Sequence, residues 1–511
     1  MSELEQLLGL FVAAVLLAAA ARRVGAPYPV FLALGGAALA FAPVAPMFTL
    51  PPELALALFV APVLLDAAYD ASLRDLRDNW APLTSLVVFA VVLTTIAVAL
   101  VAHAMVPAIP WAAAIALGAI VAPPDAVAAT AVLRQLHPPH RLLTILEGES
   151  LLNDASALLI YRLAVGAVAA GGFSAAAVAP AFLLAVAGSV VAGPALGWIT
   201  LRVMERVQHP PTAIILQFVT TFGIWILAEH LGLSGVLTVV CYAMTVAQTA
   251  PARISARLRI QAYAVWETVV FGLNILAFIF IGLQVRPILD SLEPVARGQY
   301  FTVAGAVMLT VIAVRIVWHM SFNGVARWRD RRFGFRPPRP LLRPSVGSGL
   351  LISWAGMRGI VSLAAALALP PAFPYRGLIV LTAFSVVLGT LVIQGLTLKP
   401  LLRALDLHDD DPVGRELRAA RERAVRAGLA KIAHDESAVG DTVRQELTRH
   451  LAAAALDGEA ADSRTLHGEL HRAAVGAARQ AVLAMRANDE IGDDAFHRIE
   501  EELDWLEMTD G

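Results

Sequence analysis

Apolar stretches long enough to cross a lipid bilayer recur from the first residues of the chain almost to Lys399. The hydrocarbon core of a membrane takes about 20 apolar residues as a helix. Because backbone groups in lipid must be hydrogen-bonded within the protein, each stretch is expected to be helical. The sequence predicts an all-α polytopic membrane protein with about thirteen spans, at residues 4–21, 28–45, 52–71, 82–106, 111–133, 142–168, 175–201, 211–229, 232–250, 264–284, 300–322, 345–369 and 375–398.

Charge divides the chain into two parts. Residues 1–403 hold 26 Lys and Arg against 17 Asp and Glu, whereas residues 404–511 hold 13 against 24. We therefore expect a transmembrane domain over 1–403 and an acidic, helical cytoplasmic tail over 404–511. The acidic balance excludes a nucleic-acid partner. A single cysteine, Cys241, excludes a disulfide framework and a cysteine-based metal centre.

Loop charges orient the spans, because Lys and Arg in short loops favour the cytoplasmic side. The loops after spans 1, 3, 5, 7, 9 and 11 hold 18 arginines, and those after spans 2, 4, 6, 8, 10 and 12 hold 3. This asymmetry predicts an N-terminus outside and a tail inside. The first stretch starts with Glu3 and Glu5 and ends at Arg22-Arg23 without a small-residue cleavage site, so it is expected to be a retained span.

Polar residues inside the apolar spans are the functional signal. A charged side chain at the bilayer centre costs about 2.5 to 3.5 kcal/mol, so it normally faces a cavity or a partner. We interpret four others, Arg162, Glu267, Arg315 and His319, as snorkelling residues or interfacial pairs, since most lie near a span end. The main cluster comprises Asp66, Asp125, Glu147, Glu149, Asn153, Asp154 and Arg358.

The fifth span contains Pro123-Pro124, followed directly by Asp125. Two prolines remove two backbone donors, so the helix is expected to open there. Broken helices in membranes line a cavity or are covered by protein, and transporters hold ions at such breaks. The alternative is a proline kink with Asp125 as the N-cap of the second half-helix, and both can hold together.

The sixth span carries two neighbouring polar stripes. Glu147, Ser150 and Asp154 share one helical face, and Glu149 and Asn153 lie on the next. Interhelical hydrogen bonds of about 0.6 kcal/mol would explain the serine and the asparagine. Such hydrogen bonds do not account for three carboxylates within two turns of one helix, and this excess of acidic residues favours an ion site.

The twelfth span is the second expected break, with Gly347, Gly349, Gly356 and Gly359 around Arg358. Spans five and twelve cross the membrane in opposite directions. This spacing is expected if spans 1–6 and 8–13 are inverted repeats joined by span 7, as in many secondary transporters. Arg358 would then offset one of the buried carboxylates.

Four motifs in this order resemble the sodium/proton exchanger family, the electroneutral branch of the monovalent cation:proton antiporters, and particularly its bacterial members. They cover the apolar part of the chain, and EGESLLND is the most specific. The motifs are LFVAPVLLDAAYD at 58–70, APPDAVAATAV at 122–132, EGESLLND at 147–154 and GMRGIVSLA at 356–364.

The resemblance implies a role for each matching residue. Asp154 is similar to the essential ion-binding and proton-carrying carboxylate, with Asn153 as its neutral neighbour. Asp125, Ser150 and Asp66 resemble further contributors to the ion site. Glu149 and Arg358 resemble a supporting buried ion pair. Family members often have Thr where this chain has Pro124, so the carbonyl is kept and the hydroxyl is lost.

These observations predict a secondary transporter in the plasma membrane that exchanges sodium for a proton, one for one and without net charge, by alternating access. Oxygen ligands from Asp154, Asp125 and Ser150 suit a hard cation. Potassium/proton antiport is the nearer alternative, and a cation channel with a regulatory tail is the other. Neither an enzymatic activity nor a cofactor is expected. The expected partners are an alkali cation, a proton, the lipid bilayer and, by resemblance, a second copy in a homodimer.

Overall fold

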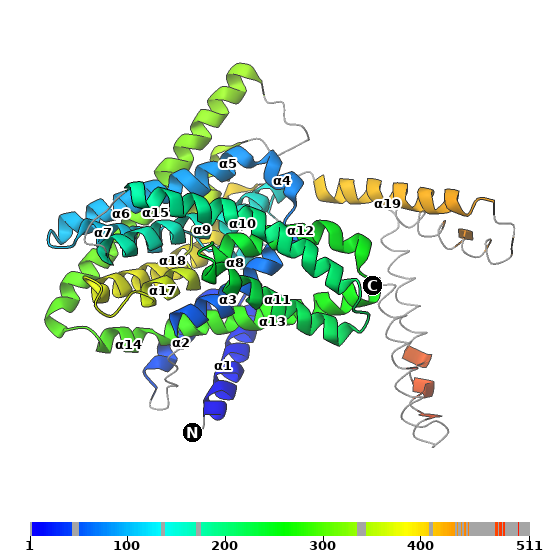
Figure 1. Cartoon of the computed structure of the whole chain (residues 1–511), viewed down its shortest axis with the longest axis horizontal. Coiled ribbons are helices and arrows are strands. Elements are labelled where there is room, and N and C mark those ends of the chain that lie inside the picture. Colours follow the sequence, from blue (N-terminus) through cyan, green and yellow to red (C-terminus); the bar gives the residue numbers. More distant parts are fainter. Residues whose placement is uncertain are drawn as a thin grey trace. The chain divides into compact units, whose positions relative to one another are not determined.

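The computed structural model describes residues 3–42, 51–133, 138–169, 175–334, 344–407 and 412–434, with short pieces of the chain beyond. Every regular element among these residues is a helix (Figure 1). The chain forms two compact units, Met1–Asp410 and Asp411–Gly511. The end of the second expected span, residues 43–45, and most of the tail lie outside the described residues.

Each expected span falls on a helix or on consecutive helices. Eight described stretches have the length and hydropathy of a full membrane span, and three shorter helices are also apolar. The chain is thus a multi-pass membrane protein, and the number thirteen stays a prediction. In chain order the helices of the first unit are α1 (Glu3–Val24), α2 (Tyr28–Ala40), α3 (Pro52–Asp70), α4 (Leu73–Asp78), α5 (Trp80–Thr84), the π-helical η1 (Ser85–Ala90), α6 (Val91–Met105), α7 (Trp111–Val121), α8 (Ala126–Leu133), α9 (His140–Ala169), α10 (Ala175–Met204), α11 (Pro210–His230), α12 (Gly235–Arg253), α13 (Ala256–Leu283), α14 (Val285–Asp290), α15 (Pro294–Phe333), α16 (Val346–Trp354), α17 (Ile360–Leu367) and α18 (Arg376–Leu405).

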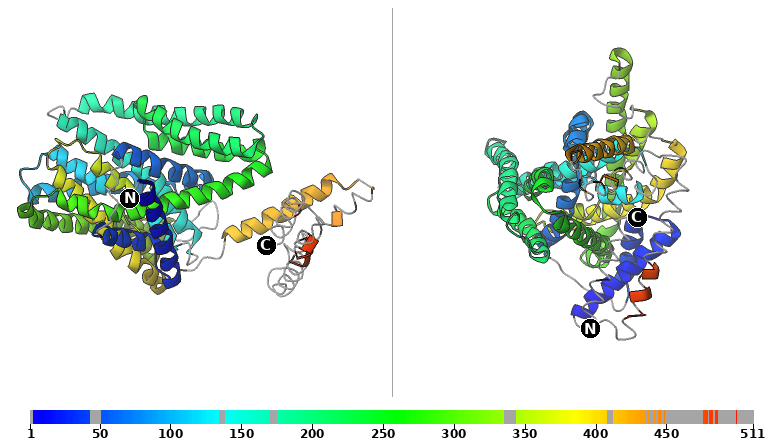
Figure 2. Two further views of the ribbon diagram at one scale, coloured as in Figure 1. Left: turned by 90° about the horizontal axis from the view of Figure 1, so that it is seen from below. Right: turned by 90° about the vertical axis from the view of Figure 1, so that its right-hand side faces the viewer.

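The helices of the first unit pack in matched pairs. α2 packs on α13 and α3 packs on α12, while α1 contacts α13 and α3 contacts α11. α6 lies against α15. These pairings exchange when α1, α2, α3 and α6 are replaced by α11, α12, α13 and α15, which is the pattern that two similar halves would give. α10 lies outside this exchange and packs on α12 (Figure 2).

Glycines allow the closest of these contacts. A Cβ on Gly36 of α2 would overlap the carbonyl of Ile279, and a Cβ on Gly282 of α13 would overlap the carbonyl of Ala33. Small residues let membrane helices approach until their backbones touch, which is how helices associate where lipid removes the hydrophobic driving force. The α2–α13 pair is therefore stabilised by close backbone packing at these glycines.

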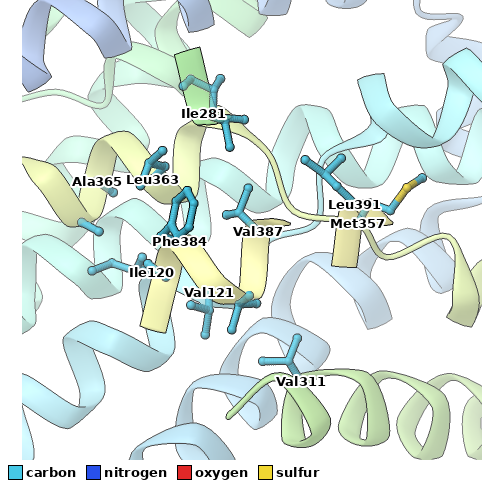
Figure 3. Packing of buried hydrophobic residues seen from close by; sticks show 14 of the residues in the cluster. Ile120, Val121, Ile281, Val311, Met357, Leu363, Ala365, Phe384, Val387 and Leu391 are labelled. Carbon is cyan, nitrogen blue, oxygen red and sulfur yellow. The ribbon is translucent and has the colours of Figure 1, made fainter. Parts of the chain in front are cut away.

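An apolar core surrounds the middle of α7, α17 and α18. Figure 3 shows Val121, Leu363 and Phe384 from these helices packed together, with Met357 and Leu391 nearby. All five side chains are at most 5% exposed. This close packing fixes the backbone of α7 and α17 on either side of the points where they are interrupted, so the polar groups there are held in place.

The second unit begins with α19, Pro412–Lys431. This helix contains five arginines and one lysine against two glutamates, although the tail as a whole is acidic. Its α-helical structure agrees with the charged helix expected at the start of the tail.

Candidate functional site

Two interrupted helices meet at the centre of the site. α7 ends at Val121 and α8 begins at Ala126, while α16 ends at Trp354 and α17 begins at Ile360. Both expected breaks are therefore present, at the prolines and at the glycines. The two breaks touch, because the backbone N–H of Asp125 donates to the carbonyl of Met357 at 2.6 Å. Half-helix ends from two distant parts of the sequence thus lie together.

Arg358 caps the C-terminal end of α7. Its Nε donates to the carbonyl of Val121 at 3.0 Å, and Nη2 donates to that of Ala122 at 3.1 Å. Nη1 donates to the carbonyl of Gly356. The side chain is 1% exposed. The last carbonyls of a helix lack partners within it and carry partial negative charge, so a buried guanidinium satisfies both needs.

Glu149 pairs with Arg315, and the expected pair with Arg358 is wrong. Arg315 on α15 holds both carboxylate oxygens of Glu149, at 2.5 and 2.8 Å, and the two side chains are 4% and 2% exposed. Arg315 also donates to the carbonyls of Ile352 and Ser353 at the end of α16. Each arginine therefore serves one half-helix C-terminus, which leaves Arg358 committed to α7.

The interpretation of Arg315 as a snorkelling or interfacial residue is wrong as well. Arg315, His319 and Asn323 are spaced four residues apart along α15, and all three are buried. A polar stripe of this spacing on an apolar helix faces protein rather than lipid. That spacing was the signal in the sequence that pointed to Arg315.

Asp125 caps a half-helix and lines a cavity, and its role in ion binding stays a prediction. Its Oδ1 accepts from the N–H of Val127 at 2.8 Å, so it caps the start of α8. It also lines a small cavity, here called the inner cavity, of about 50 Å³. The polar residues of this cavity include Asp125, Ser150 and Asp154, and Pro123 and Pro124 form part of its wall. Three of the expected ion-site residues therefore face one space.

Asp154 is the inner-cavity carboxylate that keeps its oxygens available. It is 6% exposed and has no hydrogen-bond partner among the residues that the structure describes. Asn153 beside it is fully buried and donates to the carbonyl of Pro124 at 3.0 Å. Its Oδ1 has no partner within the described chain. The pair thus presents unsatisfied oxygen atoms next to the break in the fifth span.

Asp66 lies outside the inner cavity. It lines a larger space of about 930 Å³, here called the vestibule, together with Asp70, Glu147 and Glu267. Glu267, which we interpret as a snorkelling or interfacial residue, also lines this space. Ser150 lines both spaces. An acidic vestibule therefore adjoins the inner cavity.

The opposite end of α9 is tied to α11. Arg162 donates to both carboxylate oxygens of Glu229 at 2.6 Å, and the side chains are 45% and 33% exposed. This agrees with the expectation of a pair near a span end. Glu147 and Arg162 are separated by about 22 Å along the helix at 1.5 Å per residue. Asp154 lies between the vestibule and this pair.

Two inner-cavity residues were missed from the sequence. Asn274 on α13 and Ser362 on α17 line the inner cavity with the carboxylates. Both are single neutral groups within apolar stretches, and attention to charged residues passes over them. Gly359 was expected only to loosen the helix, yet a Cβ there would overlap the carboxylate of Asp125.

Comparison with known proteins gives a consistent picture. The sodium/hydrogen exchanger transmembrane family matches residues 10–404. An uncharacterized Na⁺/H⁺ exchanger of Mycobacterium tuberculosis is 30% identical, over 94% of this chain and 91% of its own. A sodium, potassium, lithium and rubidium/H⁺ antiporter of Bacillus subtilis is 33% identical, over 74% of this chain and 58% of its own.

The fold is also known. The sodium proton antiporter MjNhaP1 of Methanocaldococcus jannaschii superposes with a TM-score of 0.59 at 18% identity, covering 79% of this chain and 99% of its own. At that identity the likeness concerns the fold alone. The family match spans both helix breaks and the acidic sixth span. Together with the crossed half-helices around a carboxylate cavity, this match places the chain in the sodium/hydrogen exchanger family, as a membrane transporter that exchanges cations for protons.

Proposed function

We propose that this chain exchanges one sodium ion for one proton, without net charge movement, in the plasma membrane. The observation that carries the proposal is the inner cavity, where Asp125, Asp154 and Ser150 meet at two crossed helix breaks. Sodium is a hard cation and takes oxygen ligands, which this cavity supplies. A space of about 50 Å³ holds an alkali cation with at most a few waters.

The stoichiometry follows from the different tasks of the two carboxylates. Asp125 is held as the cap of α8 by the N–H of Val127, whereas the oxygens of Asp154 lack a partner in the described structure. Asn153 cannot exchange a proton. Asp154 is then the group for which a proton and a cation compete, and either occupant neutralises it. One cation moves against one proton, with Asp125 as a fixed ligand.

Alternating access is supported by the two ends of α9. The vestibule includes Arg22 and Asp70, at the ends of α1 and α3, which loop charge assigns to the cytoplasm. At the other end Arg162 ties α9 to Glu229. We propose that the structure is the inward-open state and that the Arg162–Glu229 pair closes the outer side. The matched helix pairings support two inverted repeats, whose relative movement would exchange the open side.

Potassium is the second candidate cation, and a specific residue favours considering it. Pro124 offers a carbonyl without the hydroxyl of threonine, and that carbonyl already accepts from Asn153. A site with fewer strong ligands discriminates less sharply between alkali cations. The Bacillus subtilis relative is named for four of them. A channel is disfavoured because the family that matches residues 10–404 is one of sodium/hydrogen exchangers.

Everted membrane vesicles test the proposal. A pH gradient is established, and lithium, sodium, potassium or rubidium chloride is added while a pH-sensitive dye reports the lumen. We expect sodium to collapse the gradient at the lowest concentration. Collapse by potassium alone would reassign the cation. Cation flux without proton movement would indicate a channel. The homodimer expected from the resemblance is proposed here too, and cross-linking in native membranes checks it.

A further inference from the structure

We infer that Asn274 on α13 is an additional cation ligand, which binds the ion as it passes from the vestibule to the inner cavity and sets the preference among alkali cations. The inference rests on the proposed function. Five residues line both spaces and are called the neck. They are Val63, Leu64, Val127, Ser150 and Asn274.

The neck is where a cation must lose water. The vestibule, at about 930 Å³, admits a hydrated ion, whereas the inner cavity of about 50 Å³ does not admit its full water shell. A pathway that removes water must replace it with oxygen ligands, as carbonyl-lined filters do. The side chains of valine and leucine supply no oxygen ligand. Of the neck side chains, those of Ser150 and Asn274 carry oxygen.

Asn274 is suited to this task by its position and its contacts. It is partly exposed, and its amide has no hydrogen-bond partner among the residues described here. Asparagine within a membrane helix usually bonds to a neighbouring helix. An amide that lines two adjoining spaces instead, without a protein partner among the described residues, is available to water or to an ion.

The two polar neck residues come from different helices. Ser150 is on α9 with Asp154, and Asn274 is on α13. The ion is therefore bound between these helices before it reaches Asp154. Asn274 is neutral and does not change the number of exchangeable protons. Its removal should weaken cation binding and alter selectivity while leaving the coupling of one cation to one proton intact.

The test uses full-length protein in proteoliposomes, with exchange rates measured against lithium, sodium and potassium concentration. Asn274→Leu removes the oxygen while keeping the branching and the number of side-chain heavy atoms, and Asn274→Ser keeps a shorter side chain with an oxygen. Thr268→Val is the matched control, since Thr268 is on the same helix and lines the vestibule but not the neck. Melting in detergent verifies that each variant folds.

We expect Asn274→Leu to raise KM for the preferred cation by about tenfold, with the maximal rate within about twofold and smaller KM differences between the three cations. Asn274→Ser should recover part of the loss, and Thr268→Val should match wild type. Wild-type KM values in Asn274→Leu, or a lower maximal rate at unchanged KM, would overturn the inference. Absence of exchange in wild type with every alkali cation would instead refute the proposed function.

Discussion

The buried pair of Glu149 and Arg315 gives the sharpest structural prediction. Neutralising one member leaves the other charge buried without its partner, which costs about 3 to 5 kcal/mol. We therefore expect Glu149→Gln and Arg315→Met each to lower the melting temperature in detergent strongly. If the two residues were independent, the double mutant would lose the sum, about 6 to 10 kcal/mol.

The contact predicts a much smaller loss in the double mutant. With both charges removed, the remaining cost is that of the carbonyls of Ile352 and Ser353, which lose the donors of Arg315. Unsatisfied buried groups cost about 1 to 3 kcal/mol each, so the two carbonyls together cost about 2 to 6 kcal/mol. The double mutant should accordingly lose less than the sum of the singles and melt above Arg315→Met, which loses the same donors and also leaves the Glu149 carboxylate unpaired.

Arg358 supplies the matched control. It is as deeply buried as Arg315 but donates to the carbonyls of Val121, Ala122 and Gly356. Combining Arg358→Met with Glu149→Gln should therefore give little or no recovery. The assay is a melting series of the three single and two double variants beside wild type. Recovery with Arg358→Met, and none with Arg315→Met, would refute the assignment of the pair.

Three further predictions concern transport. An imposed potassium-diffusion potential should leave the exchange rate unchanged, because one-for-one exchange moves no net charge. Moving one net charge through 100 mV would change the free energy by about 2.3 kcal/mol, so a clear voltage response would mean that Asp125 also carries charge. Gly359→Ala should reduce exchange at least about tenfold, because the added Cβ occupies the place of the Asp125 carboxylate. Displacing that carboxylate also loses the helix cap that Asp125 forms, which is worth about 1 kcal/mol. Wild-type exchange rates of Gly359→Ala in vesicles would contradict the overlap. Arg162→Gln and Glu229→Gln should each lower the KM for the cation on the outer side by up to about fivefold, with little change in the KM on the inner side. The effect is bounded because an exposed ion pair contributes at most about 1 kcal/mol to closure. An unchanged outer-side KM, or the same change in the exposed control Arg286→Gln, would exclude this role.

Much of this architecture could be predicted from residue type and spacing. Long apolar runs predict membrane helices because the bilayer leaves few alternatives. The prolines before Asp125 and the glycines around Arg358 predict the breaks, because both residue types interrupt helices for local reasons. The acidic sixth span predicts the site, since the cost of burying charge is large enough to exclude a lipid-facing position.

The choice of partners could not be predicted in this way. Burial cost identifies a charge that needs a partner, but two arginines were available to Glu149. The assignment depends on which helix end each guanidinium reaches, and this is set by how α7 and α16 cross. Asn274 was missed for a related reason: a neutral amide in an apolar run carries a weak sequence signal. Its position at the neck emerges only in the folded structure, where residues of α13 and α9 line the same two spaces.

The most direct test of the central claim is sodium-driven proton movement by Asp154→Asn in proteoliposomes, beside wild type at equal protein content. Asp154 is the carboxylate of the inner cavity without a hydrogen-bond partner in the described chain, so the account makes it the shared site of cation and proton. We expect wild type to move protons when sodium is added and Asp154→Asn, inserted to the same level, to move none. Wild-type proton movement in Asp154→Asn would contradict the account.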